Sequence, residues 1–108
     1  MANNAKLLTG EEIEIKLGII PNWERVGNAI RCYKKLENFM ACLKFANKVG
    51  ALAEEMDHHP DIFIHHYKFV SLTLTTHEAT DAQGQKAQGL TRMDFDLAKK
   101  IEALTSVG

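Results

Sequence analysis

The sequence changes its hydrophobic period once, from helical to strand-like, and this change most strongly limits the folds open to the chain. Between residues 36 and 56, apolar side chains recur every three or four positions, which is the spacing of one helical face. These apolar residues are Leu36, Phe39, Met40, Leu43, Ala46, Val49, Ala53 and Met56. Asn38 is a predicted N-cap. Pro60 predicts that the helix ends near His58, because the residue before a proline is disfavoured in helical geometry.

Beyond this helix the period becomes two. In residues 68–77, Val70, Leu72 and Leu74 alternate with polar or β-branched residues, which predicts a strand with His77 at its end. The apolar run before it, within residues 62–67, predicts a partner strand. Earlier in the chain, residues 22–35 carry the two-residue turn signal Gly-Asn between short apolar runs, which predicts a hairpin.

Two further helices complete the predicted elements. Thr9 and Glu12 have the spacing of a capping box, and Pro21 is expected to stop the first helix. The last helix is predicted from apolar residues at helical spacing, namely Leu90, Met93, Leu97, Ile101 and Leu104. Residues 78–89 are polar and without pattern, so we expect a loop there. The predicted fold is one α+β domain over residues 1–108, in the order α-β-β-α-β-β-α, with a two-layer architecture: a four-stranded antiparallel sheet with three helices packed on one face.

Charge and cysteine content exclude several classes of protein. A net charge of -1 carries no electrostatic signature of a nucleic-acid or anionic-membrane partner. The first ten residues lack the apolar core of a signal peptide, and no run is long enough to cross a bilayer. Cys32 and Cys42 lack the Cys-x-x-Cys spacing of zinc or redox sites, so we expect two buried or half-buried thiols in a reducing compartment. The expected location is the cytoplasm.

Four of the five histidines lie within residues 58–66. Metal binding is not favoured, because neighbouring side chains on a strand point to opposite faces and no recognised zinc-ligand spacing is present. Proton transfer is an open alternative, since imidazole holds both protonation states near neutral pH. The pair His58–His59 at a helix end and His77 at a strand end are able to converge on one cleft.

A structural role for the histidines is the competing interpretation. The helix dipole favours histidine in a last turn without any catalytic role. For His65 and His66 we prefer this interpretation and expect one exposed imidazole and one packed beside Tyr67. For the other three histidines, composition and spacing alone do not favour catalysis.

The strings EEMDHHPDIFIHHYKFVSLTLTTHE and GLTRMDFDLAKKIEAL resemble the pterin-4a-carbinolamine dehydratase family. The family pattern is an acidic or basic residue, three positions, His-His/Asn-Pro, an aromatic residue, a second histidine and an aspartate. This sequence supplies the pattern in order with Glu54, His58, His59, Pro60, Tyr67, His77 and Asp94. The resemblance extends over nearly the whole chain.

This resemblance implies an enzyme that removes water from a 4a-hydroxytetrahydropterin and releases the quinonoid dihydropterin, a step of tetrahydrobiopterin recycling. It also implies a four-stranded antiparallel sheet with helices on one face, and assembly as a homodimer or homotetramer. It implies no metal and no organic cofactor.

Carried over residue by residue, the resemblance implies catalytic roles for His58, His59 and His77, with His58 and His77 as the proton-transfer pair and His59 orienting the ring. The residues implied to contact substrate are Asp57, Thr76, Glu78, Glu54 and Asp94. Glu54 lies one helical turn before His58, so we expect it to orient that imidazole. Asp94 is interpreted equally well as an acid that stabilises a helix start.

Two departures from the family pattern concern spacing. The 16 residues between His77 and Asp94 are more than in many members, and the six residues between Pro60 and Tyr67 are at the long end of the range. The alternative function is a non-catalytic binding or assembly protein, such as a dimerisation cofactor of a transcription factor. The three intact histidines favour catalysis over this alternative.

Overall fold

The chain folds as a four-stranded sheet with helices, and a second small sheet follows the fourth strand. The computed structural model describes residues 5–107. In chain order the elements are α1 (Gly10–Leu17), β1 (Glu24–Val26), β2 (Ala29–Lys35), α2 (Phe39–Met56), β3 (Asp61–His65), β4 (Phe69–Leu74), β5 (Thr76–Thr80), β6 (Lys86–Gly89) and α3 (Arg92–Val107). The larger sheet is antiparallel throughout and has the order β1-β2-β4-β3. The predicted α+β fold class is therefore confirmed.

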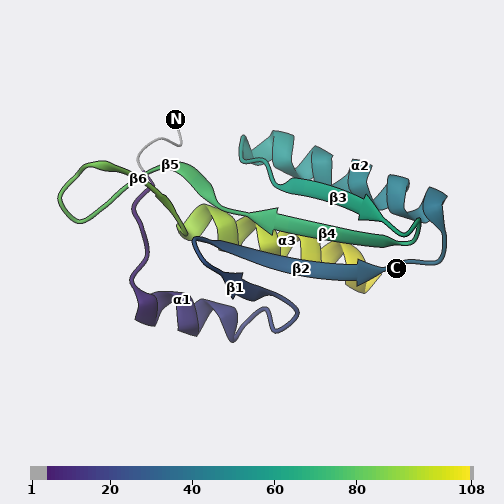
Figure 1. Ribbon diagram of the computed structural model, residues 1–108, viewed down its shortest axis with the longest axis horizontal. Helices are drawn as coiled ribbons and strands as arrows, with labels where there is room; N and C mark the ends of the chain where they lie inside the picture. Colours follow the sequence, from purple (N-terminus) through teal and green to yellow (C-terminus); the bar gives the residue numbers. More distant parts are fainter. Residues whose placement is uncertain (1–4, 108) are drawn as a thin grey trace.

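The core lies between this sheet and the helices. Figure 1 shows α2 and α3 side by side against one face of the sheet, with α1 near β1. Val70, Leu72 and Leu74 are fully buried on that face, as the strand period requires. Ile13 of α1 belongs to the same core cluster. No helix among residues 5–107 is long and apolar enough to span a bilayer.

The helix boundaries follow their capping residues. Thr9 and Glu12 form the predicted capping box, with hydrogen bonds of 3.1 and 2.8 Å, and Asn38 caps α2 through a 2.8 Å bond from the Ala41 amide. The expectation that Pro21 stops the first helix is wrong, because α1 already ends at Leu17 with Gly18 as its cap. The chain leaves the helix early, which is consistent with the burial of Ile20 and Trp23 in the core.

The prediction of a patternless loop over residues 78–89 is also wrong. Strands β5 and β6 form a two-stranded antiparallel sheet there, and His77 lies in β5 rather than at the end of the preceding strand. Backbone bonds hold β5 against the N-terminal segment, because Thr80 accepts from Leu7 and donates to Ala5 at 2.9 Å each. Asp81 closes the turn by accepting from the amides of residues 83 and 85. These long-range contacts leave no periodic pattern in the sequence.

A polar network fastens α3 to the sheet. The Glu102 carboxylate accepts hydrogen bonds from Lys34 at 3.0 Å, Trp23 at 2.9 Å and Asn22 at 3.1 Å. Burial raises the pKa of Glu102, but the hydrogen bonds from these three side chains outweigh it, so that the pKa lies below its ordinary value. The network is therefore built around an ionised carboxylate.

Candidate active site

The end of α2 sends two adjacent histidines in different directions. Asp57 adopts a left-handed conformation, with φ of 51°, and the His58 amide donates to the Ala53 carbonyl at 3.1 Å. The Asp57 amide also donates to Glu54, which completes a Schellman ending of the helix. As a result, His58 is buried, with 8% of its surface exposed, whereas His59 stays exposed.

His58 is held by Asp94 from the start of α3. The His58 Nε2 lies 2.6 Å from Asp94 Oδ1, and the Asp94 side chain is fully buried. An ionised carboxylate only accepts hydrogen bonds, so Nε2 carries the proton in this pair. In the neutral ring, Nδ1 is then the nitrogen with a free lone pair.

The other carboxylate oxygen of Asp94 is fixed from two sides. Asp94 Oδ2 accepts from the Thr76 hydroxyl and from the Thr91 amide, both at 2.9 Å. The Thr76 proton is used in this bond, so in the 2.7 Å pair of hydroxyls Thr91 donates to Thr76. The Met93 amide donates in turn to Thr91 at 3.2 Å. A directed chain of hydrogen bonds therefore runs from the first turn of α3 to the carboxylate that holds His58.

Asp94 has two structural roles, of which the sequence predicted the first, the stabilisation of a helix start. It stabilises the start of α3 by accepting from the Thr91 amide, and it also binds His58 across the fold. Thr76, expected to contact substrate, is instead buried within this network. Thr91 was missed, although its spacing to Asp94 is that of Ser/Thr-x-x-Asp before an apolar run, which signals a helix start.

His77 and Glu78 reach the surface together because of a break in the strand register. The pairing of β5 with β6 shifts between Thr76 and Ala79, and both residues between them are exposed. A regular strand would turn one of the two side chains inward. Bulges of this kind redirect side chains beside functional sites. Since Thr76 directly precedes His77, the backbone places His77 next to the network that holds His58.

Glu54 contacts a different histidine from the expected one. Its Oε2 lies 2.6 Å from His59 Nε2, and both side chains are exposed. Because His58 turns inward after Asp57, Glu54 on the outer surface of α2 meets His59 instead. The expectation that Glu54 orients His58 is therefore wrong, and Asp94 has that role in the structure.

The second histidine pair lies on the opposite sheet face. His65 stacks between Phe63 and Phe69 and its Nε2 lies 2.9 Å from the Ser71 hydroxyl. His66 is exposed in the β3–β4 turn, as expected for one of the two. The other imidazole, that of His65, was expected to pack beside Tyr67, but its ring contacts are with Phe63 and Phe69 instead.

Metal-ligating side chains do not converge anywhere in the described part of the chain, where no group of three or more histidine, cysteine, aspartate or glutamate residues is arranged to hold an ion. The site instead presents one deeply held imidazole, His58, and two exposed ones. Such an arrangement suits proton transfer between a buried, oriented group and a ligand entering from solvent.

Comparison with known proteins places this geometry in context. A family model described as pterin 4 alpha carbinolamine dehydratase matches residues 6–104. A protein of Cyanothece sp. provisionally named pterin-4-alpha-carbinolamine dehydratase is 42% identical over 103 residues, covering 95% of this chain and 97% of the relative. A provisionally so-named protein of Sulfolobus acidocaldarius is 38% identical over 97 residues, covering 90% and 97%.

Two solved structures resemble the fold. One is a transcriptional coactivator/pterin dehydratase from Brucella melitensis, with a TM-score of 0.76 and 30% identity over 92% of this chain and 98% of that chain. The other is a pterin dehydratase-like protein identified as a RuBisCO assembly factor in the alpha-carboxysome, with a TM-score of 0.54 and 20% identity over 76% and 84%. At that identity the second similarity shows the fold alone.

Proposed function

The chain belongs to the pterin-4-alpha-carbinolamine dehydratase family, and on this premise we propose that it removes water from a 4a-hydroxytetrahydropterin by histidine acid–base catalysis. The C4a–O bond breaks as the leaving oxygen receives a proton, and water departs. The N5–H bond loses its proton, and its electrons form the C4a=N5 bond of the quinonoid dihydropterin. No electron leaves the system, so the reaction needs one acid and one base.

The buried contact between His58 and Asp94 supports this mechanism most directly. Because Asp94 keeps the proton of the neutral ring on Nε2, the Nδ1 lone pair of His58 is available to accept the N5 proton. We assign His58 as the base and the exposed His77 as the acid that protonates the leaving oxygen. His59, held by Glu54, orients the pterin ring.

Polar residues around the histidines have two kinds of role in this proposal. Asp57 and Glu78 are exposed beside His58 and His77, and they bind the polar edge of the pterin. Asp94 and Thr76 are buried and act through His58 as positioning residues. The quinonoid product then re-enters tetrahydrobiopterin recycling in the cytoplasm.

The decisive experiment is a dehydratase assay on synthetic 4a-hydroxytetrahydropterin. We expect His58→Ala and His77→Ala each to lower kcat by at least about tenfold, since one proton-transfer group contributes roughly 10²–10⁴-fold. Circular dichroism should show that both variants remain folded. Unchanged rates in both variants contradict the histidine assignment.

We further propose that the chain forms homodimers or homotetramers, with β3 in the contact. This strand lies at the sheet edge, and its residues Ile62 and Phe63 are exposed. An edge strand with apolar side chains and unpaired backbone groups favours pairing with another chain. The opposite edge strand, β1, has only three residues and offers a shorter ladder.

The alternative function is a binding or assembly role without catalysis. It is supported by the Brucella melitensis structure, which is described both as a transcriptional coactivator and as a pterin dehydratase. A wild-type rate no higher than the uncatalysed reaction in the same assay favours this alternative over the dehydratase.

A further inference from the structure

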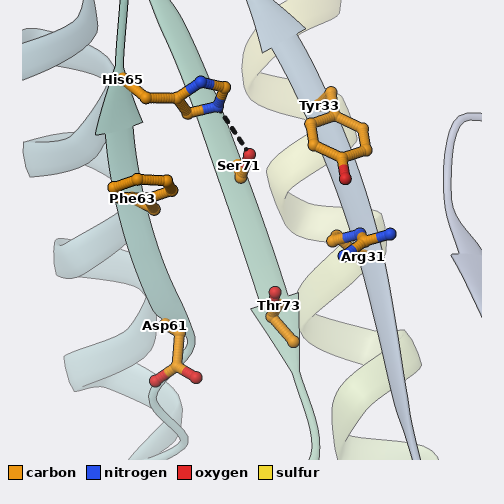
Figure 2. A pocket seen from close by; sticks show the side chains of 7 residues that line it. All are labelled: Arg31, Tyr33, Asp61, Phe63, His65, Ser71 and Thr73. Atoms are coloured by element: carbon orange, nitrogen blue, oxygen red, sulfur yellow. Dashed lines mark hydrogen bonds between the residues drawn. The ribbon is translucent and has the colours of Figure 1, made fainter. Parts of the chain in front are cut away.

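A hollow lies on the sheet face opposite the helices. It has a volume of about 350 Å³ and is lined by residues of β2, β3 and β4, namely Arg31, Tyr33, Asp61, Phe63, His65, Ser71 and Thr73 (Figure 2). That volume lies at the small end of the range of ligand sites, which is roughly 300–1,000 Å³. None of its residues belongs to the site formed by His58, His59 and His77.

The strand register places opposite charges on the two sides of a small central residue. Arg31 on β2 and Asp61 on β3 both pair with Thr73 of the central strand β4. Strands lie roughly 4.8 Å apart, so the two charged residues flank Thr73 with a separation of roughly 10 Å between their backbones. Both residues line the one hollow, and among residues 5–107 Arg31 forms its ion pair with Glu24 rather than with Asp61.

Several polar groups of this hollow lack partners. Within residues 5–107, the Asp61 carboxylate and the Thr73 hydroxyl make no hydrogen bond, and Arg31 Nε is shielded from solvent without an acceptor. Arg31 bonds Glu24 through its Nη2 alone, at 3.5 Å. A shielded donor without an acceptor marks a position that a further acceptor would satisfy.

An aromatic surface adjoins these charges. Phe63 stacks one face on His65, with ring centroids 4.9 Å apart, and His65 stacks in turn on Phe69 at 5.8 Å. Phe63 is nevertheless 63% exposed. Asp61 lies two residues before Phe63 on β3, so the two side chains share one face of the sheet. The Asp61 side chain is short, as Figure 2 shows. A flat ring fits against the free face of Phe63 and extends the stack above Thr73.

We propose that this hollow binds a free aromatic α-amino acid. The ligand ring stacks on Phe63, its ammonium group binds the Asp61 carboxylate, and its carboxylate binds the Arg31 guanidinium. A zwitterion matches the two opposite charges, and an aromatic ring matches the stack. Pairing of β3 with another chain lies in the plane of the sheet and leaves this face open. The inference does not depend on the proposed dehydratase reaction.

The test is a titration of the full chain with L-phenylalanine, followed by two-dimensional amide NMR. We expect saturable shifts at the amides of Phe63, Ser71 and Thr73. Three probes each lack one feature: 3-phenylpropanoate has no ammonium, phenylalaninamide has no carboxylate, and L-leucine has no ring. Each should bind about tenfold or more weakly than L-phenylalanine, as expected for loss of a desolvated charge contact or of the stack.

Variants assign each feature of the ligand to one residue. Asp61→Asn should weaken L-phenylalanine about tenfold and leave 3-phenylpropanoate unchanged, because only the former carries the ammonium group. Phe63→Leu should weaken L-phenylalanine about tenfold, whereas Phe39→Leu, an exposed aromatic residue of α2, should not. The amide spectrum of each free variant shows whether it is folded.

Four outcomes overturn the proposal. Two concern the shifts: no saturable shifts, or shifts confined to the region of His58 and His77. The other two concern selectivity: L-leucine binds as well as L-phenylalanine, or Asp61→Asn weakens L-phenylalanine and 3-phenylpropanoate equally.

Discussion

The substitution Asp94→Asn tests how the buried carboxylate controls His58. The Thr91 amide can only donate, so the side-chain atom that replaces Oδ2 must be the oxygen of the asparagine amide. The Thr76 hydroxyl can donate to the same oxygen. The asparagine NH₂ group then takes the place of Oδ1 and faces His58 Nε2 at the former distance of 2.6 Å. Two donors cannot bond each other, so the neutral ring must move its proton to Nδ1.

This tautomer change removes the base without removing the histidine. A ring protonated on Nδ1 has no lone pair at the atom that we assign to the N5 proton. We therefore expect kcat to fall by roughly 10²–10⁴-fold, the usual contribution of a general base. The stability cost should be smaller, about 1–3 kcal/mol, because the bonds from Thr76 and Thr91 persist and the tautomer change lets the asparagine NH₂ donate to His58 Nε2, so that what is lost is the carboxylate charge and the preferred tautomer. Asp94→Ala, by contrast, leaves the buried His58 ring and the Thr76 hydroxyl without their acceptor and should cost more, because each buried polar group left without a partner costs about 1–3 kcal/mol.

Two measurements distinguish positioning from simple damage. Imidazole ¹⁵N NMR should place the proton of the neutral His58 ring on Nε2 in wild type and on Nδ1 in Asp94→Asn. The matched control is Asp96→Asn, on the same helix, where the carboxylate is 45% exposed and contacts only Arg92, at 3.6 Å, among the described residues. This control should retain the wild-type rate. A folded Asp94→Asn variant with the wild-type kcat, or with the proton still on Nε2, refutes the reasoning.

Three further predictions concern stability, thiol chemistry and assembly. The pKa of Glu102 lies below its ordinary value of 4.5 in the folded chain, so its contribution is present above pH 4.5 and is lost as the pH falls through the folded pKa. Glu102→Gln should therefore cost roughly 1–3 kcal/mol at neutral pH, and this cost should decline as the pH is lowered below 4.5, measured by urea unfolding with tryptophan fluorescence. A cost that stays constant as the pH is lowered contradicts this. Burial raises the pKa of Cys32 to about 12, and Cys42 is fully buried. A thiol reagent should therefore label the native chain slowly and should label both thiols rapidly when the chain unfolds. Rapid labelling of the native chain contradicts this. Ile62→Lys on the edge strand β3 should shift the chain to a smaller oligomer, measured by light scattering, whereas Ile15→Lys, a control at another exposed isoleucine, should not. If the two variants have the same mass, β3 is not part of the contact between chains.

Sequence periodicity predicted the main elements because their hydrophobic faces point to one core. The alternation of residues 70–74 requires one buried face, and the structure buries it. The helical period also predicted α2, but only part of the predicted face is correct: the buried residues are Cys42, Phe45, Val49 and Ala53. Phe39, Met40 and Leu43 of the predicted face are exposed. The capping residues Thr9 and Asn38 were also predictable, since a cap bonds amides only three residues away.

The strands after Leu74 were not predictable from periodicity. A register shift interrupts the alternation between Thr76 and Ala79, and the first strand of this hairpin is held by backbone bonds to residues 5–7. Bonds between backbone groups distant in the chain do not depend on side-chain type, so they leave no trace in the order of residues.

In the candidate site, residue identities were predictable from the sequence and side-chain pairings were not. The histidines, Glu54 and Asp94 could be named from the sequence, because the chemistry of proton transfer and the family pattern both specify residue types. The pairing of these side chains could not, and an i,i+4 spacing wrongly joined Glu54 to His58. The left-handed Asp57 rotates the chain after α2, so that His58 turns toward Asp94, 36 residues away, and His59 toward Glu54. Sequence determined which groups are present, and only the tertiary structure decided which carboxylate holds which imidazole, because that choice depends on the backbone conformation at Asp57 and on the packing of α3 against α2.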